Sequence, residues 1–139
     1  MADDHDDEMP TTYRGPDAPV STYLTTEILT IAPTASVRDA ARMIAGASVG
    51  CLVVGTTDEV VAIVSERDVV RAVADGADLD QLTVGELGSH TLVWASIDDT
   101  VGDVAEEMME DYVRHVLVRD DSGLVGVLSM RDVLAAYTM

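Results

Sequence analysis

The sequence contains two copies of one pattern, separated by a constant offset of 64 residues. The clearest match is Ser-x-Arg-Asp-Val, which begins at Ser65 and again at Ser129. Further positions match at the same offset without gaps: Val20, Val37, Asp39, Ala41, Val54 and Val61 recur as Val84, Val101, Asp103, Ala105, Val118 and Val125. A chain of 139 residues with such a repeat is expected to consist of two copies of one supersecondary unit that share a core.

The first copy is predicted to form a helix, two strands and a second helix. Apolar residues at helical spacing follow Ser36, a favourable N-cap, and the helix is expected to close at Gly46. The apolar runs 51–54 and 60–64 predict two short strands joined by a turn. Another helix is expected to start at Ser65.

The second copy repeats this order. Its elements are expected to be a helix over 101–111 capped by Thr100, strands over 116–118 and 125–128, and a helix over 131–137. A short extended lead-in is expected before each copy, at 28–31 and 92–95. Because the strands are continuously apolar, the sheets are expected to be covered on both faces, so the predicted fold class is α/β (α+β).

Composition divides the chain into three parts. Residues 1–19 form an acidic tail that contains three prolines and is expected to be mobile. The first repeat is assigned to residues 20–78 and the second to residues 79–139.

The charge balance is strongly acidic, with 26 Asp and Glu against 8 basic residues, all of them arginine, and a formal net charge of −18. Nucleic acids and anionic membranes are recognised through clustered Lys and Arg, so neither is an expected partner. Self-repulsion of this size destabilises a compact fold unless salt screens it, which favours a halophilic, haloarchaeal-type origin over an ordinary acidic bacterial protein.

The sequence also predicts where the protein resides. No apolar run approaches the roughly 20 residues that cross a bilayer, and the acidic start lacks the features of a secretory signal. The single cysteine, Cys51, cannot form an internal disulfide and is expected to be a small buried side chain. We therefore expect a cytoplasmic protein.

The repeated motif places a hydroxyl, a guanidinium and a carboxylate where an apolar strand turns into a helix. We call residues 65–68 the Ser65 turn and residues 129–132 the Ser129 turn. Free backbone N–H groups at a helix start attract phosphate, Arg adds positive charge, and Asp accepts from ribose hydroxyls. Ser-x-x-Asp is also a helix-capping arrangement, so a single copy has a purely structural explanation. Two copies that both carry the arginine favour a nucleotide site.

Residues 20–137 resemble a tandem pair of cystathionine-β-synthase (CBS) domains, also called a Bateman module. The resemblance rests on the strand that ends in Gly-h-x-Ser/Thr-x-x-Asp, with h apolar, in each repeat. It implies two repeats related by pseudo-two-fold symmetry, with AMP, ADP, ATP, S-adenosylmethionine or an NAD-like ligand in clefts between them. It also implies that ligand occupancy regulates another protein, here in trans.

The resemblance implies a role for ten residues. It implies that phosphate or ribose is contacted by Ser65 and Ser129, that ribose hydroxyls are bound by Asp68 and Asp132, and that phosphate is contacted by Arg67 and Arg131. It also implies that the adenine pocket is lined by Ile63 and Val127 and that the base is contacted by the backbone of Leu29 and Val93. In the family, the lead-in of one repeat generally faces the turn of the other. Leu29 is therefore expected beside the Ser129 turn and Val93 beside the Ser65 turn.

The two copies differ near their turns. Ala62 stands where the second copy has Gly126, and its methyl group is expected to crowd a ligand at the Ser65 turn. At the start of the middle strand, Val49, Gly50 and Cys51 align with Val113, Arg114 and His115. By the same cross-facing rule, Arg114 and His115 are expected to border the Ser65 turn, and the smaller residues the Ser129 turn.

Three function classes follow from these features. The preferred one is a non-catalytic, ligand-sensing regulatory module, and the alternative is a structural dimerisation scaffold with empty clefts. An enzyme is disfavoured, because no nucleophile–base pair or metal-ligand cluster is recognisable, and no catalytic cofactor is expected. The resemblance implies a flat homodimer formed through helices, for which the apolar faces with Met43, Ile44 and Met108 are candidates.

Overall fold

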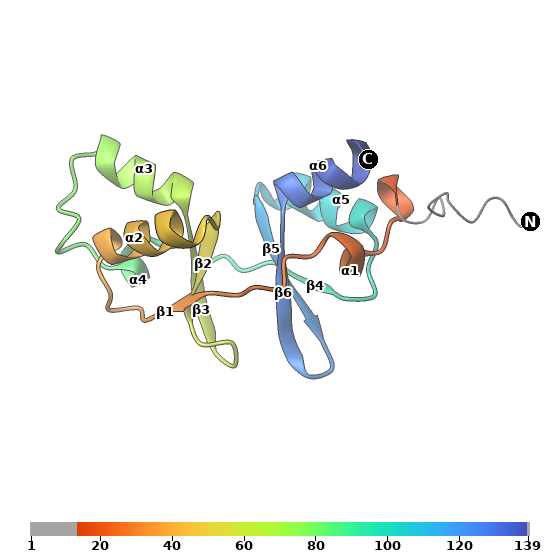
Figure 1. Ribbon diagram of the computed structural model, residues 1–139, viewed down its shortest axis with the longest axis horizontal. Helices are drawn as coiled ribbons and strands as arrows, with labels where there is room; N and C mark the ends of the chain where they lie inside the picture. The colour runs from red at the N-terminus through yellow and green to blue at the C-terminus, as the bar shows by residue number, and fades with distance from the viewer. Residues whose placement is uncertain (1–13, 139) are drawn as a thin grey trace, which may run out of the picture. The chain divides into compact units, whose positions relative to one another are not determined.

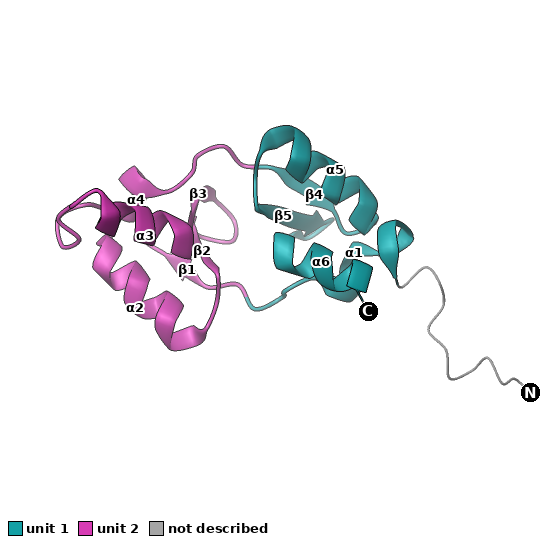
Figure 2. Ribbon diagram, turned by 90° about the horizontal axis from the view of Figure 1, so that it is seen from above, with its two compact units in different colours: residues 1–27, 93–139 teal, residues 28–92 magenta. Residues whose placement is uncertain are grey.

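The structure is a computed structural model that describes residues 14–138. The chain divides into two compact units (Figure 2). Unit 1 combines the N-terminal segment up to Glu27 with the segment from Val93 onward, and unit 2 is Ile28–Leu92.

Unit 2 is built on a three-stranded sheet in the order β1-β2-β3. Strand β1 runs parallel to β2, and β3 runs antiparallel to it (Figure 1). The elements are β1 (Thr30–Ile31), α2 (Val37–Ala47), β2 (Cys51–Gly55), β3 (Val60–Ser65), α3 (Glu66–Ala74) and α4 (Val84–Leu87).

Unit 1 has the same topology, with the sheet order β4-β5-β6 and the same parallel and antiparallel pairs. Its elements are the 3-10 helix η3 (Gly15–Asp17), α1 (Val20–Tyr23), β4 (Trp94–Ser96), α5 (Val101–Asp111), β5 (His115–Asp120), β6 (Gly123–Ser129) and α6 (Met130–Thr138).

The predicted fold class and the helix-strand-strand-helix order are confirmed in both copies. Helix α5 has the predicted bounds, and the other predicted helices and strands lie within two residues of the prediction. The lead-in strands β1 and β4 each start two residues later than predicted. The sequence did not reveal α1 and α4, because helices of four residues are too short to show a helical period.

Each unit has its own apolar core. In unit 2, alternate residues of the strands, such as Leu52 and Val64, pack with Ala40 and Ile44 of α2 and Val84 of α4. Unit 1 has a matching cluster that includes Val104 and Met108 of α5. Three consecutive residues at the centre of β2 and of β5 are buried, so the side chains on both faces of each sheet are shielded from water, as predicted.

The short helices are exchanged between the repeats. Helix α1 precedes the first repeat, yet it belongs to unit 1, where Val20 N donates to Asp99 O at 3.1 Å. Helix α4 precedes the second repeat and belongs to unit 2, where Val84 N donates to Ala35 O at 2.9 Å. The compact units therefore differ from the segments 20–78 and 79–139, because each lead segment packs with the other repeat.

Residues 14–19, which we had assigned to the mobile tail, lie against unit 1. Ala18 is fully buried, and its carbonyl accepts from Val101 N at 2.8 Å. Pro16 packs on α5 so closely that a Cβ on Gly102 would lie 2.8 Å from it. The acidic composition of residues 1–19 gave no indication of this packing. Residues 1–13 lie outside the described part of the chain.

Two residues that we had expected on a dimer surface lie in the cores instead. Ile44 is 7% exposed and Met108 is 1% exposed, since both point from their helices toward the sheets. Met43 is only partly buried against the core of unit 2. The sides of α2 and α5 that carry Ile44 and Met108 are therefore used inside their own units.

The helices are short, and the longest, α2 and α5, have 11 residues each. Within residues 14–138 no helix is long and apolar enough to span a bilayer, which takes about 20 residues.

Candidate functional site

The two turns lie where β3 leads into α3 and where β6 leads into α6 (Figure 1). Each strand ends at a serine because the hydroxyl caps the following helix. Ser65 has an extended backbone, with φ −111° and ψ 164°, and serves as the N-cap of α3. Local sequence thus positions both serines and aspartates without help from the rest of the fold.

Both turns form a reciprocal capping box. In the Ser129 turn, the backbone N–H of Ser129 donates to Asp132 Oδ2 at 2.9 Å, and its hydroxyl donates to the same oxygen at 3.0 Å. Asp132 N in turn donates to Ser129 Oγ at 3.2 Å. The Ser65 turn has the same three bonds, at 2.8, 3.1 and 3.2 Å. The structural role that the sequence offered as an alternative is therefore present in both copies.

The capping box uses only one oxygen of each aspartate. In Asp132, the capping bonds from Ser129 and a further contact from Thr25 Oγ1, at 3.4 Å, all reach Oδ2. Asp68 Oδ1 lies 3.7 Å from the guanidinium of Arg71, which is 60% exposed. Exposed ion pairs at this distance are weak, so the outer oxygen of each aspartate keeps acceptor capacity for a ligand hydroxyl.

The first-turn amides are mostly satisfied, contrary to our expectation of free N–H groups. Met130 N donates to Arg114 O at 2.9 Å, and Glu66 N donates to Gly50 O at 3.0 Å. The capping box takes two more amides in each helix. In the first turns of α3 and α6, the amides of Arg67 and Arg131 have no hydrogen-bond partner within residues 14–138. Their exposed guanidinium groups extend from the same residues.

One residue beside each turn, Thr25 or Ser89, was not predicted from the sequence. Thr25 forms an isolated bridge with Val127, with hydrogen bonds of 3.0 and 3.1 Å, and Ser89 forms the same bridge with Ile63 at 2.8 and 3.0 Å. Thr25 and Ser89 are related by the offset of 64, and both carry a hydroxyl. The matching positions of these two hydroxyl residues can be seen in the sequence. The sequence does not show which turn each of them joins, because the lead segments are exchanged between the repeats.

Basic side chains are distributed unequally around the two turns. In unit 1, His115 lies opposite Ser129 in the sheet, and Arg114 contacts the start of α6 through its carbonyl. In unit 2, the matching positions are Cys51, which lies opposite Ser65, and Gly50. Each residue thus adjoins the turn of its own unit, and the expectation that Arg114 and His115 border the Ser65 turn stays a prediction. Cys51 is partly exposed rather than buried.

The remaining predicted site residues lie on strands and lead-ins. Ile63 and Val127 are each 8% exposed, two residues before the serines. The carbonyls of Leu29 and Val93 each accept a strand amide at 2.9 Å, from Val53 and Leu117. The expected contact of their backbone groups with a base stays a prediction. Val49 packs at the edge of the unit 2 core. The predicted pairing of each lead-in with the opposite turn stays a prediction.

No cluster of three His, Cys, Asp or Glu side chains that could hold a metal ion forms among the residues that the structure describes.

Comparison with known proteins gives a consistent result. A family profile described as "CBS domain" matches the chain twice, over residues 20–75 and 84–138. The CBS domain-containing protein YhcV of Bacillus subtilis is 26% identical over 114 residues, which cover 81% of each chain. Two solved structures are similar over most of their length. An uncharacterized conserved protein from Pyrococcus horikoshii has a TM-score of 0.78 at 29% identity, covering 88% of this chain and 93% of the other. A CBS domain protein from Pyrobaculum aerophilum, complexed with AMP, has a TM-score of 0.71 at 35% identity, covering 82% and 88%.

Proposed function

The chain belongs to the CBS domain family as a tandem pair, and on this premise we propose that it is a regulatory module that binds an adenosine-containing ligand at its two Ser–Asp turns. AMP is the first candidate, because a relative with 35% identity is complexed with it. ADP, ATP, S-adenosylmethionine and NAD share the adenosine group and are the next candidates.

The observation that supports this proposal most is the set of groups that capping leaves unused. At the Ser129 turn these are Asp132 Oδ1, the amide of Arg131 and the exposed Arg131 guanidinium. A carboxylate oxygen accepts from ribose hydroxyls, and an amide with a guanidinium at a helix start binds phosphate. The capping bonds keep these groups in place before a ligand arrives, which reduces the entropy lost on binding.

We assign the stronger phosphate binding to the Ser129 turn. Its own unit supplies Arg131, Arg114 and His115 close to the start of α6, whereas the matching positions of unit 2 supply only Arg67. In unit 2, Arg71 also lies near the outer oxygen of Asp68. In a chain with a net charge of −18, the two arginines beside the Ser129 turn are the best available place for an anion.

Calorimetric titration with AMP tests the proposal. We expect Asp132→Ala to weaken AMP binding by about tenfold or more, because a buried or half-buried hydroxyl loses its acceptor. The matched control is Asp103→Ala, which removes the same capping position from α5, where no arginine follows the cap. Both variants lose about 1 kcal/mol of unfolding free energy, but only Asp132→Ala affects binding.

Adenosine and AMP, compared in one variant, test the role assigned to the guanidinium. Arg131→Ala is expected to weaken AMP but to leave adenosine unchanged, since only AMP carries a phosphate. Equal losses for both ligands would assign Arg131 to folding instead. If no adenosine compound binds the wild-type chain, the module is a scaffold, which is the alternative function that we retain.

Occupancy of the turns is proposed to regulate a partner protein in trans rather than to support catalysis. CBS-domain-only proteins are generally regulatory. Ligand recovered unchanged after prolonged incubation with the protein agrees with this proposal, and conversion of AMP or ATP to a product contradicts it.

A further inference from the structure

Residues 14–25, which we call the strap, pack against parts of unit 1 that are distant in the sequence. Ala18 and Val20 of the strap are fully buried in the core of unit 1, and the carbonyl of Ala18 accepts from Val101 N at 2.8 Å. The chain that joins the strap to β4 forms unit 2. The docking of the strap on unit 1 is therefore not supported by an adjacent element of the same unit, and it must offset the entropy of closing a long loop.

In unit 2 the position of the strap is occupied by residues 78–89, which match it at the offset of 64. The bond from Val37 N to Leu82 O, at 2.9 Å, is the counterpart of the strap bond from Val101 N. Residues 78–89 follow α3 within the same unit, so the preceding helix anchors their start. The two segments thus have the same contacts at their centres but differ in how the chain attaches them.

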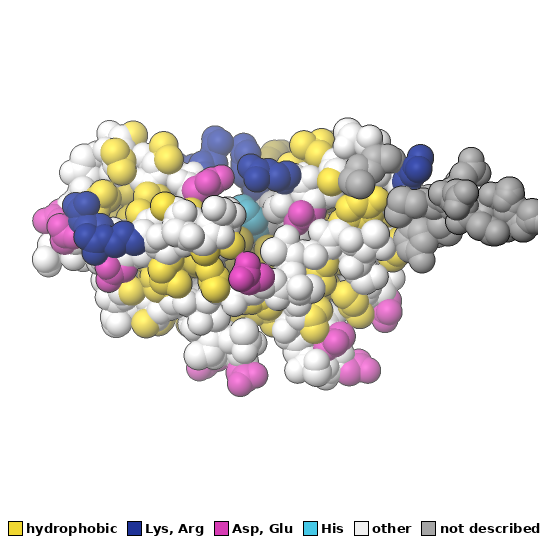
Figure 3. Space-filling view, in the orientation of Figure 1, with side chains coloured by type: hydrophobic (Ala, Val, Ile, Leu, Met, Phe, Trp, Pro, Cys, Tyr) yellow, Lys and Arg dark blue, Asp and Glu magenta, His cyan; other side chains and the backbone are white. Residues whose placement is uncertain are grey.

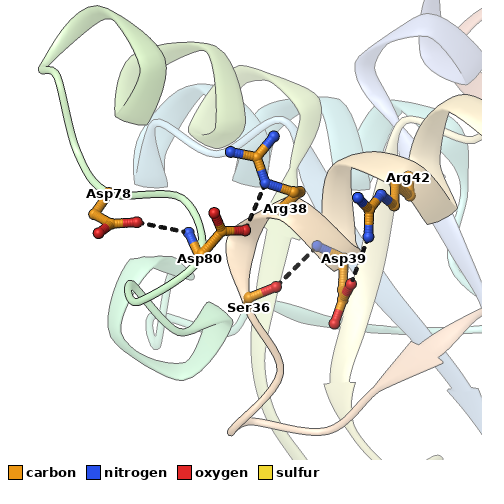
Figure 4. A network of polar contacts seen from close by, with 6 residues as sticks. All are labelled: Ser36, Arg38, Asp39, Arg42, Asp78 and Asp80. Atoms are coloured by element: carbon orange, nitrogen blue, oxygen red, sulfur yellow. Dashed lines mark hydrogen bonds and ion pairs between the residues drawn. The ribbon is translucent and has the colours of Figure 1, made fainter.

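Charged side chains hold the segment 78–89 in place. Figure 3 shows basic and acidic side chains beside one another over the part of unit 2 that contains α2. There Arg38 is hydrogen-bonded and ion-paired with Asp80, and Asp78 Oδ1 accepts from Asp80 N at 3.0 Å (Figure 4). The residues of unit 1 that match this ion pair are Gly102 and Pro16, which carry no charge. The ion pair therefore has no counterpart at the strap.

The short helices of the two segments also differ in their caps. In α4, Thr83 and Glu86 form a reciprocal capping box, with bonds of 3.0, 2.9 and 3.2 Å. In α1 the matching residues are Pro19 and Thr22, and the N-cap Pro19 makes no side-chain capping bond. A capping box stabilises the start of a helix, so α1 is the less stable of the two helices. The strap is thus held less strongly than residues 78–89.

The last residue of the strap contacts the Ser129 turn. Thr25 and Val127 exchange backbone hydrogen bonds of 3.1 and 3.0 Å, and Val127 lies two residues before Ser129. Thr25 Oγ1 also lies 3.4 Å from Asp132 Oδ2, the oxygen that accepts the capping bonds. When the strap leaves unit 1, the Ser129 turn loses these contacts on one side.

We propose that the strap opens from unit 1 as one cooperative segment, without unfolding of the unit, and that a ligand bound at the Ser129 turn holds it closed. The sheet β4-β5-β6 and helices α5 and α6 lie within residues 94–138, so they do not need the strap for their own hydrogen bonds. A ligand that requires the intact turn binds the closed form better and therefore shifts the strap toward closure.

Opening of the strap changes the surface of unit 1. It exposes Ala18 and Val20 together with the part of the core that they cover, so ligand occupancy controls how much apolar surface a partner meets. The opening itself does not depend on nucleotide binding, whereas its control by a ligand rests on the function proposed above.

Native-state hydrogen exchange without nucleotide tests the opening. Opening of the strap frees amides both on the strap and on the rest of unit 1: Val20, Thr25, Val101 and Val127. We expect them to share one protection factor, about tenfold or more below that of Leu117, whose amide is bonded to Val93 O. The control is the set of matched amides in unit 2, which are expected to exchange more slowly: Val84, Ser89, Val37 and Ile63. Equal protection in the two segments, or strap amides as protected as Leu117, would overturn the proposal.

Transfer of the capping box tests whether the strap opens as one segment. The double variant P19T/T22E places the capping pair of α4 at the matching positions of α1. It is expected to raise the protection of all strap amides by about three- to tenfold, including those of Val101 and Val127, which lie outside α1. The matched control P19A/T22A also removes the proline but supplies no cap, and it is expected to give no rise. A rise confined to α1 would contradict cooperative opening.

Hydrogen exchange with AMP tests the control by ligand. When only the closed form binds, AMP at about 100 times its dissociation constant raises the protection of the strap amides by about 100-fold. Asp132→Ala is expected to remove this effect of AMP. Calorimetric binding of AMP without a rise in strap protection would overturn the coupling and leave the proposed function in place. Absence of AMP binding would overturn the coupling together with the proposed function, while the exchange without nucleotide still decides whether the strap opens.

Discussion

The side chain of Leu24 fills the space in which a Cβ on Gly126 would lie. Leu24 Cγ is 2.6 Å from that position, and the carbonyl oxygen of Thr25 is equally close. Gly126 is therefore a glycine because the exchanged lead segment passes directly over its strand. The bridge between Thr25 and Val127 fixes this close approach.

In unit 2 the glycine of this close contact lies on the lead segment rather than on the strand. There the strand residue is Ala62, and the lead-segment residue that matches Leu24 is Gly88. A Cβ on Gly88 would lie 3.3 Å from the methyl group of Ala62. Ala62 is fully buried in the unit 2 core, so its methyl group faces the lead segment. Packing thus accounts for the alanine, and the expectation that its methyl group crowds a ligand stays a prediction.

A double-mutant cycle tests this exchange of volume. Gly126→Ala is expected to lower the unfolding free energy by about 1–3 kcal/mol through overpacking. Leu24→Gly is expected to cost about 2–5 kcal/mol, because it removes a core contact and adds backbone freedom. The double variant L24G/G126A reproduces the pair found in unit 2, so it is expected to cost less than the sum of the single changes. Urea denaturation of the four proteins provides the comparison.

The control for this cycle is Gly46→Ala in α2. A Cβ there would meet nothing within 4 Å, so alanine is expected to stabilise the helix by about 0.5–1 kcal/mol. Strict additivity of the two changes in the cycle would show that Leu24 and Gly126 do not compete for the same space.

The capping box of α4 predicts a dependence of stability on pH. Hydrogen bonds from the backbone N–H and hydroxyl of Thr83 lower the pKa of Glu86 below its usual value of 4.5. A carboxyl whose pKa is lower in the folded state stabilises the fold above its unfolded pKa, and this stabilisation is lost as the pH falls through the folded value. Glu86→Gln keeps an acceptor but removes the charge.

Thermal unfolding between pH 6 and pH 3 measures this effect, with the lower end chosen to pass the usual glutamate pKa. The wild type and Glu86→Gln are expected to approach one another in stability as the pH falls below 4.5. A constant difference between the two proteins across the range would contradict this prediction. Comparing the two proteins cancels the titration of the other carboxylates.

Salt is expected to stabilise the fold. With 26 acidic residues and 8 arginines, the folded chain repels itself, and raising the salt from 0.1 to 1 M shortens the Debye length from about 10 to about 3 Å. The thermal midpoint should therefore rise with NaCl more than with sucrose of equal osmolality, which acts by exclusion alone. Equal effects of the two solutes would argue against both charge repulsion and the proposed halophilic setting.

Local patterns determined most of what could be predicted from the sequence. Ser65, Thr100 and Ser129 each combine a cap with a following carboxylate, and apolar runs define the strands, so the order of elements and the position of both turns could be predicted. Even the structural role of the aspartates followed from the spacing Ser-x-x-Asp.

Features that depend on distant segments could not be predicted. The exchange of α1 and α4 brings Thr25 to Val127 and Ser89 to Ile63, and no local pattern encodes which repeat a lead segment joins. The helical spacing of apolar residues placed Ile44 and Met108 on the apolar faces of their helices. It could not show that these faces pack on a core rather than on a partner. The left-handed backbone of Tyr112 had no signal, because glycine is the usual marker of such a cap.

The central claim is that the groups left unused by the capping boxes bind a nucleotide. The most direct measurement is a titration of the backbone amide resonances with AMP. We predict the largest shifts at the amide of Arg131, with smaller ones at Met130, whose amide is bonded to Arg114 O at 2.9 Å. Saturable shifts that spare the Ser65 and Ser129 turns, or no shifts at any AMP concentration, would contradict the account.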